Sequence, residues 1–421
     1  MTSRRVLIVS TTFFPDPQVA AIRMTQWCRH LPDKGWQPIV ACRHYGYDAT
    51  REVLDDKVHP GVEVRHLTAA PTVDRVRAQE RTWSPLRQIQ TALASLVYSP
   101  DASARFWTSI DHKLLALVDE FKPEVILTTA PPYGIHRAGM RLARKTGIPW
   151  VADFREAFIA DPRYRPRGLH TWQWPAYRKY EKDVYQQAAL VIHQLPVHQR
   201  WARRQYPFAK HKCVTMINGF SDALIDGSIA PELASGGRRS VRVVGTCLDG
   251  DALKIAQAVA RMVRGGHDME LRFVGRLPET LPQMRELLGD RVIATGYVRY
   301  DRAVAEILGA DVLVNYLSDQ RRSGMIISTK LIEYIATRKP VVEVNPTWSN
   351  RRFARHWPQV KRLDDASDQA LAAALIQANG ASIAPDTEQY KTYCEDFRWS
   401  RQVETVAGWF NAVADRRPIV E

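Results

Sequence analysis

The sequence is poor in the residues and runs that mark metal-binding, disulfide-bonded and membrane-spanning proteins. Its 421 residues include only five cysteines, and these are scattered: Cys28, Cys42, Cys213, Cys247 and Cys394. No pair has zinc-ligand spacing and an odd number argues against a disulfide framework, so we expect no metal cofactor and a reducing compartment. No apolar run approaches the roughly 18 residues of a membrane span. The first apolar run lacks a cleavage site and is interpreted as a buried strand, not a signal peptide.

Common signatures of nucleotide-binding, hydrolytic and nucleic-acid-binding proteins are also missing. The sequence has neither a G-x-G-x-x-G nor a Walker loop, and no Ser-centred nucleophile elbow. Pro196 separates His193 from His198, which argues against a shared helical face for a metal. The net charge of +14 favours anionic partners. Because no zinc-finger or RNA-binding aromatic signature accompanies this charge, we expect no nucleic acid among them.

The chain does contain a repeated alternation of short apolar runs and amphipathic helical patterns. The strand-like runs are RVLIVS, QPIVACR, VEVRHL, EVILTTA, IPWVADF and ALVIHQL, followed by VRVVGT, LRFVG, RVIATGYV, DVLVNY and KPVVEV. A helical pattern after the first run places Met24, Trp27, Cys28 and Leu31 on one apolar face. Alternating strands and helices predict parallel sheets, and continuous apolar runs predict strands buried on both faces. The predicted fold class is therefore α/β, with doubly wound sheets.

One stretch interrupts this alternation. Residues 217–240 are rich in Gly, Ser and Asp and have no long apolar run. We predict a first domain over residues 1–216, a linker over 217–240, a second domain over 241–395 and a C-terminal helix over 396–421 that can cross back to the first domain. Since ligands bind at the carboxyl ends of parallel strands, we expect the site in a cleft between the two domains.

The segment SGMIISTKLIEYIATRKPVVEV, residues 323–344, carries the most informative local pattern. Ser328 or Thr329 is a good N-cap for a helix that the KP dipeptide ends. A helix N-terminus suits phosphate, Lys330 adds a positive charge, and Glu333 can accept two hydroxyl hydrogen bonds, as from a ribose diol. The local pattern alone leaves open a second interpretation, a capped core helix with two solvated charges.

Several segments together resemble retaining glycosyltransferases of family four, which have the two-domain GT-B fold. STKLIEYIATRKPVV is similar to that family's P-S-K-L-x-E-Y-x-A-x-G-K-P-V segment. PEVILTTAPPYG and WVADFREAF resemble its first-domain strand ends, and YEKDVYQQAALVIHQL and VTMINGFSDA resemble its approach to the linker. The resemblance runs over most of the chain and implies two Rossmann-like domains that face a central cleft.

The resemblance also implies roles for individual residues. Glu333 would hold the ribose hydroxyls, and Lys330 with the Ser328 and Thr329 amides would meet the diphosphate of a nucleotide sugar. Many relatives have a donor-contacting Glu eight positions before the equivalent of Glu333, and that position is Met325 here. The remaining residues implied at the nucleotide sugar are Gly245, Thr246, Arg276, Tyr297, Val298, Ser323 and Gly324.

In the first domain, Asp153 and Arg155 at a strand end would face the cleft. Asp153 joins Lys330 and Glu333 as a catalytic candidate, and the alternative interpretation of Asp153 and Arg155 is an internal ion pair. A further segment mixes aromatic and basic side chains, which suits a membrane interface or ordinary packing equally well: Trp172, Trp174, Tyr177, Arg178 and Lys179.

We therefore predict a retaining glycosyltransferase that moves a sugar from a nucleoside diphosphate sugar to a hydroxyl acceptor. The acceptor is a glycan, a glycolipid or a small molecule, as in the assembly of cell-surface polysaccharide. The predicted location is cytoplasmic, with peripheral binding to an anionic membrane surface at the inner face of the plasma membrane left open. Two alternatives also stay open: a catalytically degenerate nucleotide-sugar-binding partner subunit, and a sugar epimerase or hydrolase with the GT-B fold.

Overall fold

The computed structural model describes residues 3–14, 16, 19–43, 58–68, 100, 101, 103–165, 168–317, 326–364 and 367–419. These residues form two compact units. The first contains the described residues up to Ile217 and again from Gln402 onward, and the second runs from Asn218 to Arg401. Among the described residues, no helix has the length and apolar character that crossing a bilayer requires.

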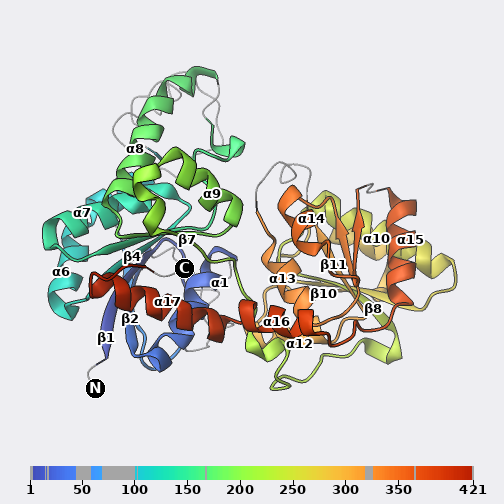
Figure 1. The fold of residues 1–421 in the computed structure, drawn as a ribbon. Coiled ribbons are helices and arrows are strands. Elements are labelled where there is room, and N and C mark those ends of the chain that lie inside the picture. Colours follow the sequence, from blue (N-terminus) through green and yellow to red (C-terminus); the bar gives the residue numbers. More distant parts are fainter. Residues whose placement is uncertain are drawn as a thin grey trace. The chain divides into compact units, whose positions relative to one another are not determined.

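The first unit is built on a parallel sheet of seven strands in the order β3-β2-β1-β4-β5-β6-β7 (Figure 1). Ile8 in β1, an interior strand, lies opposite Val40 on one side and Leu127 on the other. Both neighbours are fully buried, as the continuous apolar runs predict. The strands are β1 (Arg4–Ser10), β2 (Trp36–Arg43), β3 (Glu63–Leu67), β4 (Val125–Ala130), β5 (Trp150–Phe154), β6 (Leu190–His193) and β7 (Cys213–Thr215).

Helices cover both faces of this sheet (Figure 1). The last helix of the chain returns to this unit: the ring of Phe410 packs edge-on against Trp36 with centroids 5.4 Å apart, and Arg4 pairs with Asp415 at 2.8 Å. This confirms the predicted return of the C-terminal helix. The helices are α1 (Val19–His30), α5 (Ser103–Ser109), α6 (Asp111–Phe121), α7 (His136–Thr146), α8 (Trp174–Gln187), α9 (Pro196–Gln205) and α17 (Trp399–Ala414).

The second unit contains a parallel sheet of six strands in the order β10-β9-β8-β11-β12-β13. The order reverses between β8 and β11, which is the topological switch point of a doubly wound sheet. The strands are β8 (Arg239–Val244), β9 (Met269–Val274), β10 (Val292–Ala294), β11 (Val312–Tyr316), β12 (Val341–Val344) and β13 (Val360–Leu363). The helices are α10 (Asp249–Arg264), α11 (Leu281–Leu288), α12 (Tyr300–Leu308), α13 (Thr329–Ala336), α14 (Trp348–Ala354), α15 (Asp368–Asn379) and α16 (Glu388–Phe397).

Both predicted doubly wound sheets are thus present, but each has one strand more than the sequence pattern predicted. The additional strands, β7 and β13, are short and lie at the sheet edges. The sequence of β13 is VKRL, with its two central side chains exposed. An edge strand needs only one paired side and can carry polar residues, so its apolar signal is weak.

Candidate functional site

The carboxyl end of the second sheet, at its switch point, brings together residues from three separate segments. Gly245 and Thr246 follow β8, Arg276 follows β9, and Lys330 and Glu333 lie in helix α13, which follows β11. The sheet topology explains why these residues lie near one another, since all parallel strands finish at the same end of the sheet. Ligands of doubly wound sheets bind at such an end.

Two glycines leave the backbone without side chains at the carboxyl end of this sheet. Gly245 has φ +96° and Gly275 has φ +127°, both in the region that disfavours residues with a Cβ. The Gly245 N–H donates to the Val274 carbonyl at 2.6 Å, so the two turns are joined. A Cβ at Gly245 would lie 2.9 Å from Cε of Lys330. The absence of a side chain therefore leaves room for the lysine to lie across the turn.

Lys330 is half-buried and its ammonium donates a hydrogen bond to the Thr246 carbonyl. This contact fixes the positive charge beside the turn after β8, and Lys330 itself lies in the first turn of α13. Helix N-termini carry a partial positive charge, so both features favour an anion at this point.

Glu333 lies three residues after Lys330, about one turn along the same helix, and is only 8% exposed. Burial raises the pKa of its carboxyl to about 7, while the Tyr300 hydrogen bond and the Lys330 charge act in the opposite direction. The Tyr300 hydroxyl donates to Oε1 of Glu333 over a long 3.5 Å. The carboxylate thus keeps acceptor capacity that a pair of ligand hydroxyls could use.

The residues at the start of α13 are held by the protein itself. Ser328 occupies the N-cap position, but its backbone N–H donates to Oδ1 of Asn350 at 3.0 Å and its hydroxyl to Oδ1 of Asn315 at 3.2 Å. The hydroxyl of Thr329 accepts from Nδ2 of Asn218 at 3.0 Å. The Ser328 amide, which the sequence suggested for phosphate, is therefore engaged in anchoring the helix.

The other predicted residues differ in their surroundings. The side chain of Tyr297 is 45% exposed in the loop before α12, and Val298 beside it is half-buried. Arg276 pairs with Asp249 at 3.4 Å and with Glu279 at 3.7 Å, so the protein already supplies counter-charges for it. Ser323, Gly324 and Met325 lie outside the described residues.

In the first unit, Asp153 at the end of β5 is fully buried and fully partnered. Its Oδ1 pairs with the guanidinium of Arg23 at 3.1 Å, and its Oδ2 accepts from the Thr129 hydroxyl at 2.7 Å. Arg23 also donates to the Met216 carbonyl at 3.0 Å. This is an internal ion pair of the kind that the sequence left open, with Arg23 and not Arg155 as the partner. A catalytic role for Asp153 stays a prediction that this geometry does not support.

The guanidinium of Arg155 also donates its hydrogen bonds within the first unit. Its guanidinium binds the backbone carbonyls of Ala20, Ala130 and Pro131. Buried next to it is His136, whose pKa is lowered to about 3 by burial and by the Arg155 charge. Residues at the carboxyl end of the first sheet therefore serve mainly to hold each other.

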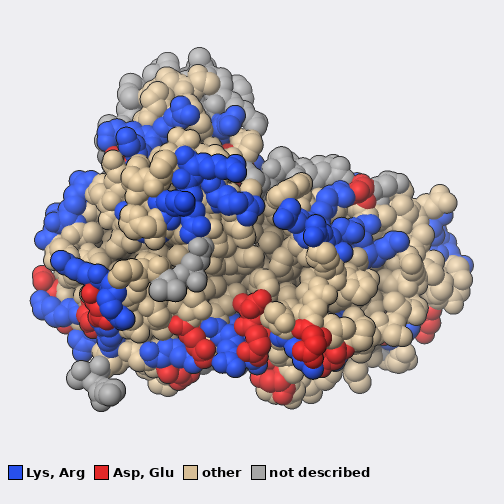
Figure 2. Space-filling model, in the orientation of Figure 1, with Lys and Arg blue, Asp and Glu red and all other residues tan. Residues whose placement is uncertain are grey.

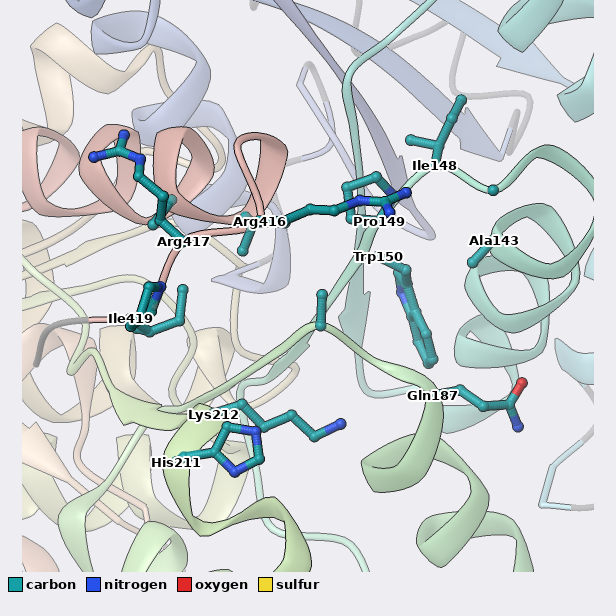
Figure 3. Close-up of a pocket in the computed structure, with 15 residues that line it drawn as sticks. Ala143, Ile148, Pro149, Trp150, Gln187, His211, Lys212, Arg416, Arg417 and Ile419 are labelled. Atoms are coloured by element: carbon teal, nitrogen blue, oxygen red, sulfur yellow. The ribbon is translucent and has the colours of Figure 1, made fainter.

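A pocket of about 550 Å³ opens at the opposite end of the first sheet, where its strands begin (Figure 3). Its walls include Pro149 and Trp150 at the start of β5, Lys212 before β7, and Arg416 from the C-terminal segment. Because it lies at the amino ends of the strands, it is separate from the edge where doubly wound sheets bind ligands. Among the described residues, no three His, Cys, Asp or Glu side chains are grouped as a metal site would need.

Comparisons with known proteins agree with this architecture. Residues 20–219 match the family model described as the glycosyl transferase 4-like domain. A glycosyltransferase from Rickettsia africae matches with a TM-score of 0.62 and 13% identity over 98% of this chain and 99% of that chain. Anabaena HepE, solved with UDP and glucose, matches with a TM-score of 0.55 and 14% identity over 98% and 97% of the chains. UDP-GlcNAc 2-epimerase from Methanocaldococcus jannaschii matches with a TM-score of 0.56 and 10% identity over 97% and 99%.

At such low identities, these solved structures establish the fold alone, and that fold is GT-B. A search of curated proteins found no match. Residues 20–219 belong to the glycosyl transferase 4-like domain family. The chain thus carries a glycosyl transferase 4-like domain within a GT-B fold, in agreement with the class that the sequence resemblance predicted.

Proposed function

We propose that the protein transfers a sugar from a nucleoside diphosphate sugar to a hydroxyl acceptor, with retention of anomeric configuration. In this proposal the donor binds at the carboxyl end of the second sheet. Glu333 accepts the two ribose hydroxyls, and Lys330 with the first turn of α13 faces the diphosphate. The base lies along the loop of Tyr297 and Val298. Anabaena HepE, a protein of the same fold, has been solved with UDP and glucose, which supports a donor of this class.

One observation carries the proposal: a buried carboxylate and a cation lie one helical turn apart, beside a turn whose positive φ favours glycine. Glu333 is 8% exposed, with its pKa raised to about 7 by burial, and Lys330 lies across Gly245. Burying a carboxylate with one long hydrogen bond is unfavourable for stability alone. A ligand with paired hydroxyls and an adjacent diphosphate would satisfy both charges.

The same groups account for the chemistry. When the bond from the anomeric carbon to the diphosphate breaks, the electron pair and the negative charge pass to the diphosphate. Lys330 and the N-terminus of α13 stabilise that charge, and interactions of this kind are typically worth 10²–10³ in rate each. In a same-face route, the departing phosphate takes the proton of the acceptor hydroxyl as the new bond to the anomeric carbon forms.

For the acceptor, we propose a glycan or glycolipid in cell-surface assembly, reached from an anionic membrane surface. The support is the surface of the first unit, where Lys and Arg side chains gather around helices α8 and α9 (Figure 2). Trp172 is 42% exposed, and Arg178, Lys179 and Lys182 of α8 are exposed. Exposed aromatic and basic side chains together favour binding at the headgroup region of a bilayer.

A two-stage assay tests the proposal. First, the melting temperature of the protein is measured with UDP, GDP, dTDP and ADP sugars, since a bound ligand stabilises in proportion to the logarithm of its excess over Kd. The best donor is then incubated with candidate acceptors, and the anomeric configuration of the product is read by NMR. We expect a transferred sugar of unchanged configuration. Donor binding without turnover would instead support a non-catalytic partner subunit, and isomerised or free sugar would support an epimerase or hydrolase.

A further inference from the structure

Four residues form a closed ring of hydrogen bonds at the start of α13, through three side chains and both the backbone N–H and the hydroxyl of Ser328. The Ser328 N–H and hydroxyl donate to Oδ1 of Asn350 and Oδ1 of Asn315 at 3.0 and 3.2 Å. The amide groups of Asn350 and Asn315 both donate to Oε1 of Glu343, at 2.5 and 3.2 Å. Glu343 therefore reaches Ser328 along two routes, one from the end of β11 and one from α14.

The ring fixes the orientation of both carboxamides. Each must turn its oxygen toward Ser328, which offers two donors, and its nitrogen toward the carboxyl group, which offers an acceptor. Asn315, Asn350 and Glu343 are all fully buried. Without Glu343, both amide groups would be buried without an acceptor in this ring, and a buried polar group without a partner is unfavourable.

A carboxyl group at this place is unfavourable for the sheet itself. Its neighbours in β12, Val341, Val342 and Val344, are buried valines, the residues expected of a central parallel strand. Burial raises the pKa of Glu343 to about 7, and its Oε2 has no hydrogen-bond partner among the described residues. Such local conflicts with stability are expected where a residue serves a function.

The position of the ring suggests what that function is. Ser328 precedes Lys330 by two residues and Glu333 by five, so the ring sets where the first turn of α13 begins and how it is rotated. A displacement of about 1 Å at a binding group can cost on the order of 100-fold in rate. We propose that Glu343 is a positioning residue for the donor site, which holds Lys330 and Glu333 in place through Asn315, Asn350 and Ser328. This inference rests on the proposed function.

The test compares three variants of the full chain. Glu343→Gln keeps an acceptor for both amides and should bind nucleotide within about twofold of the wild type. Glu343→Leu removes the acceptor and should weaken binding about tenfold and lower kcat/KM by at least as much. Val342→Ala, the adjacent buried position of β12, is the control: it lowers the melting temperature but should leave nucleotide affinity unchanged. Calorimetry with the nucleoside diphosphate that most stabilises the wild type gives Kd.

The outcomes separate this inference from the proposed function. If the wild type binds no nucleoside diphosphate, the proposed function fails. If the wild type binds and folded Glu343→Leu binds equally well, the positioning role of Glu343 is wrong, and so it is if Glu343→Gln loses as much affinity as Glu343→Leu. Should Glu343→Leu not fold, Ser328→Ala removes one link of the ring and should weaken nucleotide binding several-fold, whereas unchanged binding would overturn the role.

Discussion

The carboxyl ends of the two sheets both carry charged residues, yet they use them in opposite ways. In the first unit, Asp153 is paired with Arg23 and Arg155 is bound to three backbone carbonyls. In the second unit, Glu333 has one long hydrogen bond from a tyrosine and its pKa is raised to about 7, and Lys330 lies along a glycine turn. The charged residues at the carboxyl end of the first sheet have partners within the protein, whereas Glu333 at the carboxyl end of the second sheet is buried with few hydrogen-bond donors.

This difference shows why a charged residue at a strand end is not sufficient to indicate a ligand site. A buried charge with a complete set of partners is explained by the fold. A buried charge with an incomplete set of partners needs either protonation or a ligand. This criterion supports the proposed donor site in the second unit, whereas the charged residues described at the strand ends of the first unit have structural partners.

The largest expected effect tests the structural role of the buried ion pair in the first unit. Asp153→Asn leaves the guanidinium of Arg23 buried without a counter-charge, and we expect the free energy of unfolding to fall by about 3–5 kcal/mol. Urea denaturation measures this loss. Asp119→Asn is the matched control, because Asp119 forms an exposed ion pair with Lys122 and should change stability by less than about 0.5 kcal/mol. An Asp153→Asn protein of wild-type stability that has lost transfer would instead make Asp153 a catalytic residue.

The next effect falls on activity. Lys330→Ala and Glu333→Ala should each lower kcat/KM by about 10²–10³-fold, which corresponds to about 2.7–4 kcal/mol of transition-state stabilisation. The melting temperature of Glu333→Ala without donor should not fall in proportion, because the variant also removes an unfavourable buried charge. The two measurements are steady-state transfer and thermal unfolding. Wild-type turnover by a folded Glu333→Ala protein would refute the assignment of the site.

Gly245 offers a way to separate backbone strain from displacement of Lys330. Gly245→Ala adds a Cβ about 2.9 Å from Cε of the lysine at φ +96°, so we expect about 1–3 kcal/mol of destabilisation and about tenfold weaker donor binding. Gly147→Ala is the control, because Gly147 has φ +73° with no neighbouring atom within 4 Å of its added Cβ. The control should lose stability and keep its donor affinity. Equal affinity in both variants would mean that Lys330 does not need this turn.

A smaller effect concerns pH. With a pKa of about 7, Glu333 should be mostly ionised at pH 8 and mostly protonated at pH 6, so affinity for a nucleotide sugar should rise about tenfold over this interval. A nucleotide sugar is suitable because its diphosphate is fully ionised throughout. Glu333→Gln should remove most of the change, and an unaltered profile in that variant would assign the titration to another group.

The stability of the protein without donor should change with pH in the opposite direction to donor affinity. The folded pKa lies above the ordinary value of 4.5, so the folded state binds more protons than the unfolded state between these values. Stability without donor therefore falls as pH rises from about 4.5 to about 7, and Glu333→Gln should reduce this loss. Unfolding free energies at several pH values provide the check.

The sequence predicted most of the fold because strongly buried parallel strands leave a continuous apolar signal. Runs such as VLIV in β1 and LVIH in β6 are visible without any tertiary information. The strands that escaped prediction, β7 and β13, are short edge strands whose pairing partner lies on one side only. Their existence depends on the sheet to which they add, and no local pattern of three or four residues reveals that.

The sequence also indicated Lys330 and Glu333, because both lie in one helix with a clear N-cap. It did not indicate Tyr300, Asn315 or Glu343. Tyr300 contacts Glu333 and Asn315 contacts Ser328, while Glu343 is linked to this helix only through Asn315 and Asn350, and each of these contacts joins separate segments of the chain. Only one signal was available for Glu343: a carboxylate within an otherwise apolar strand. The pairing of Asp153 with Arg23 was missed for the same reason, since it joins positions 130 residues apart.

The most direct test of the donor site uses the ribose diol itself. Calorimetry gives the affinities of the wild type and of Glu333→Ala for the ribonucleoside diphosphate that stabilises the protein most and for its 2′-deoxy counterpart. Hydrogen bonds to a charged group contribute about 1.5–3 kcal/mol, so the wild type should prefer the ribose form at least about tenfold. Glu333→Ala should bind the two forms almost equally. A variant that keeps the full preference would contradict the account, because the diol would then be recognised elsewhere.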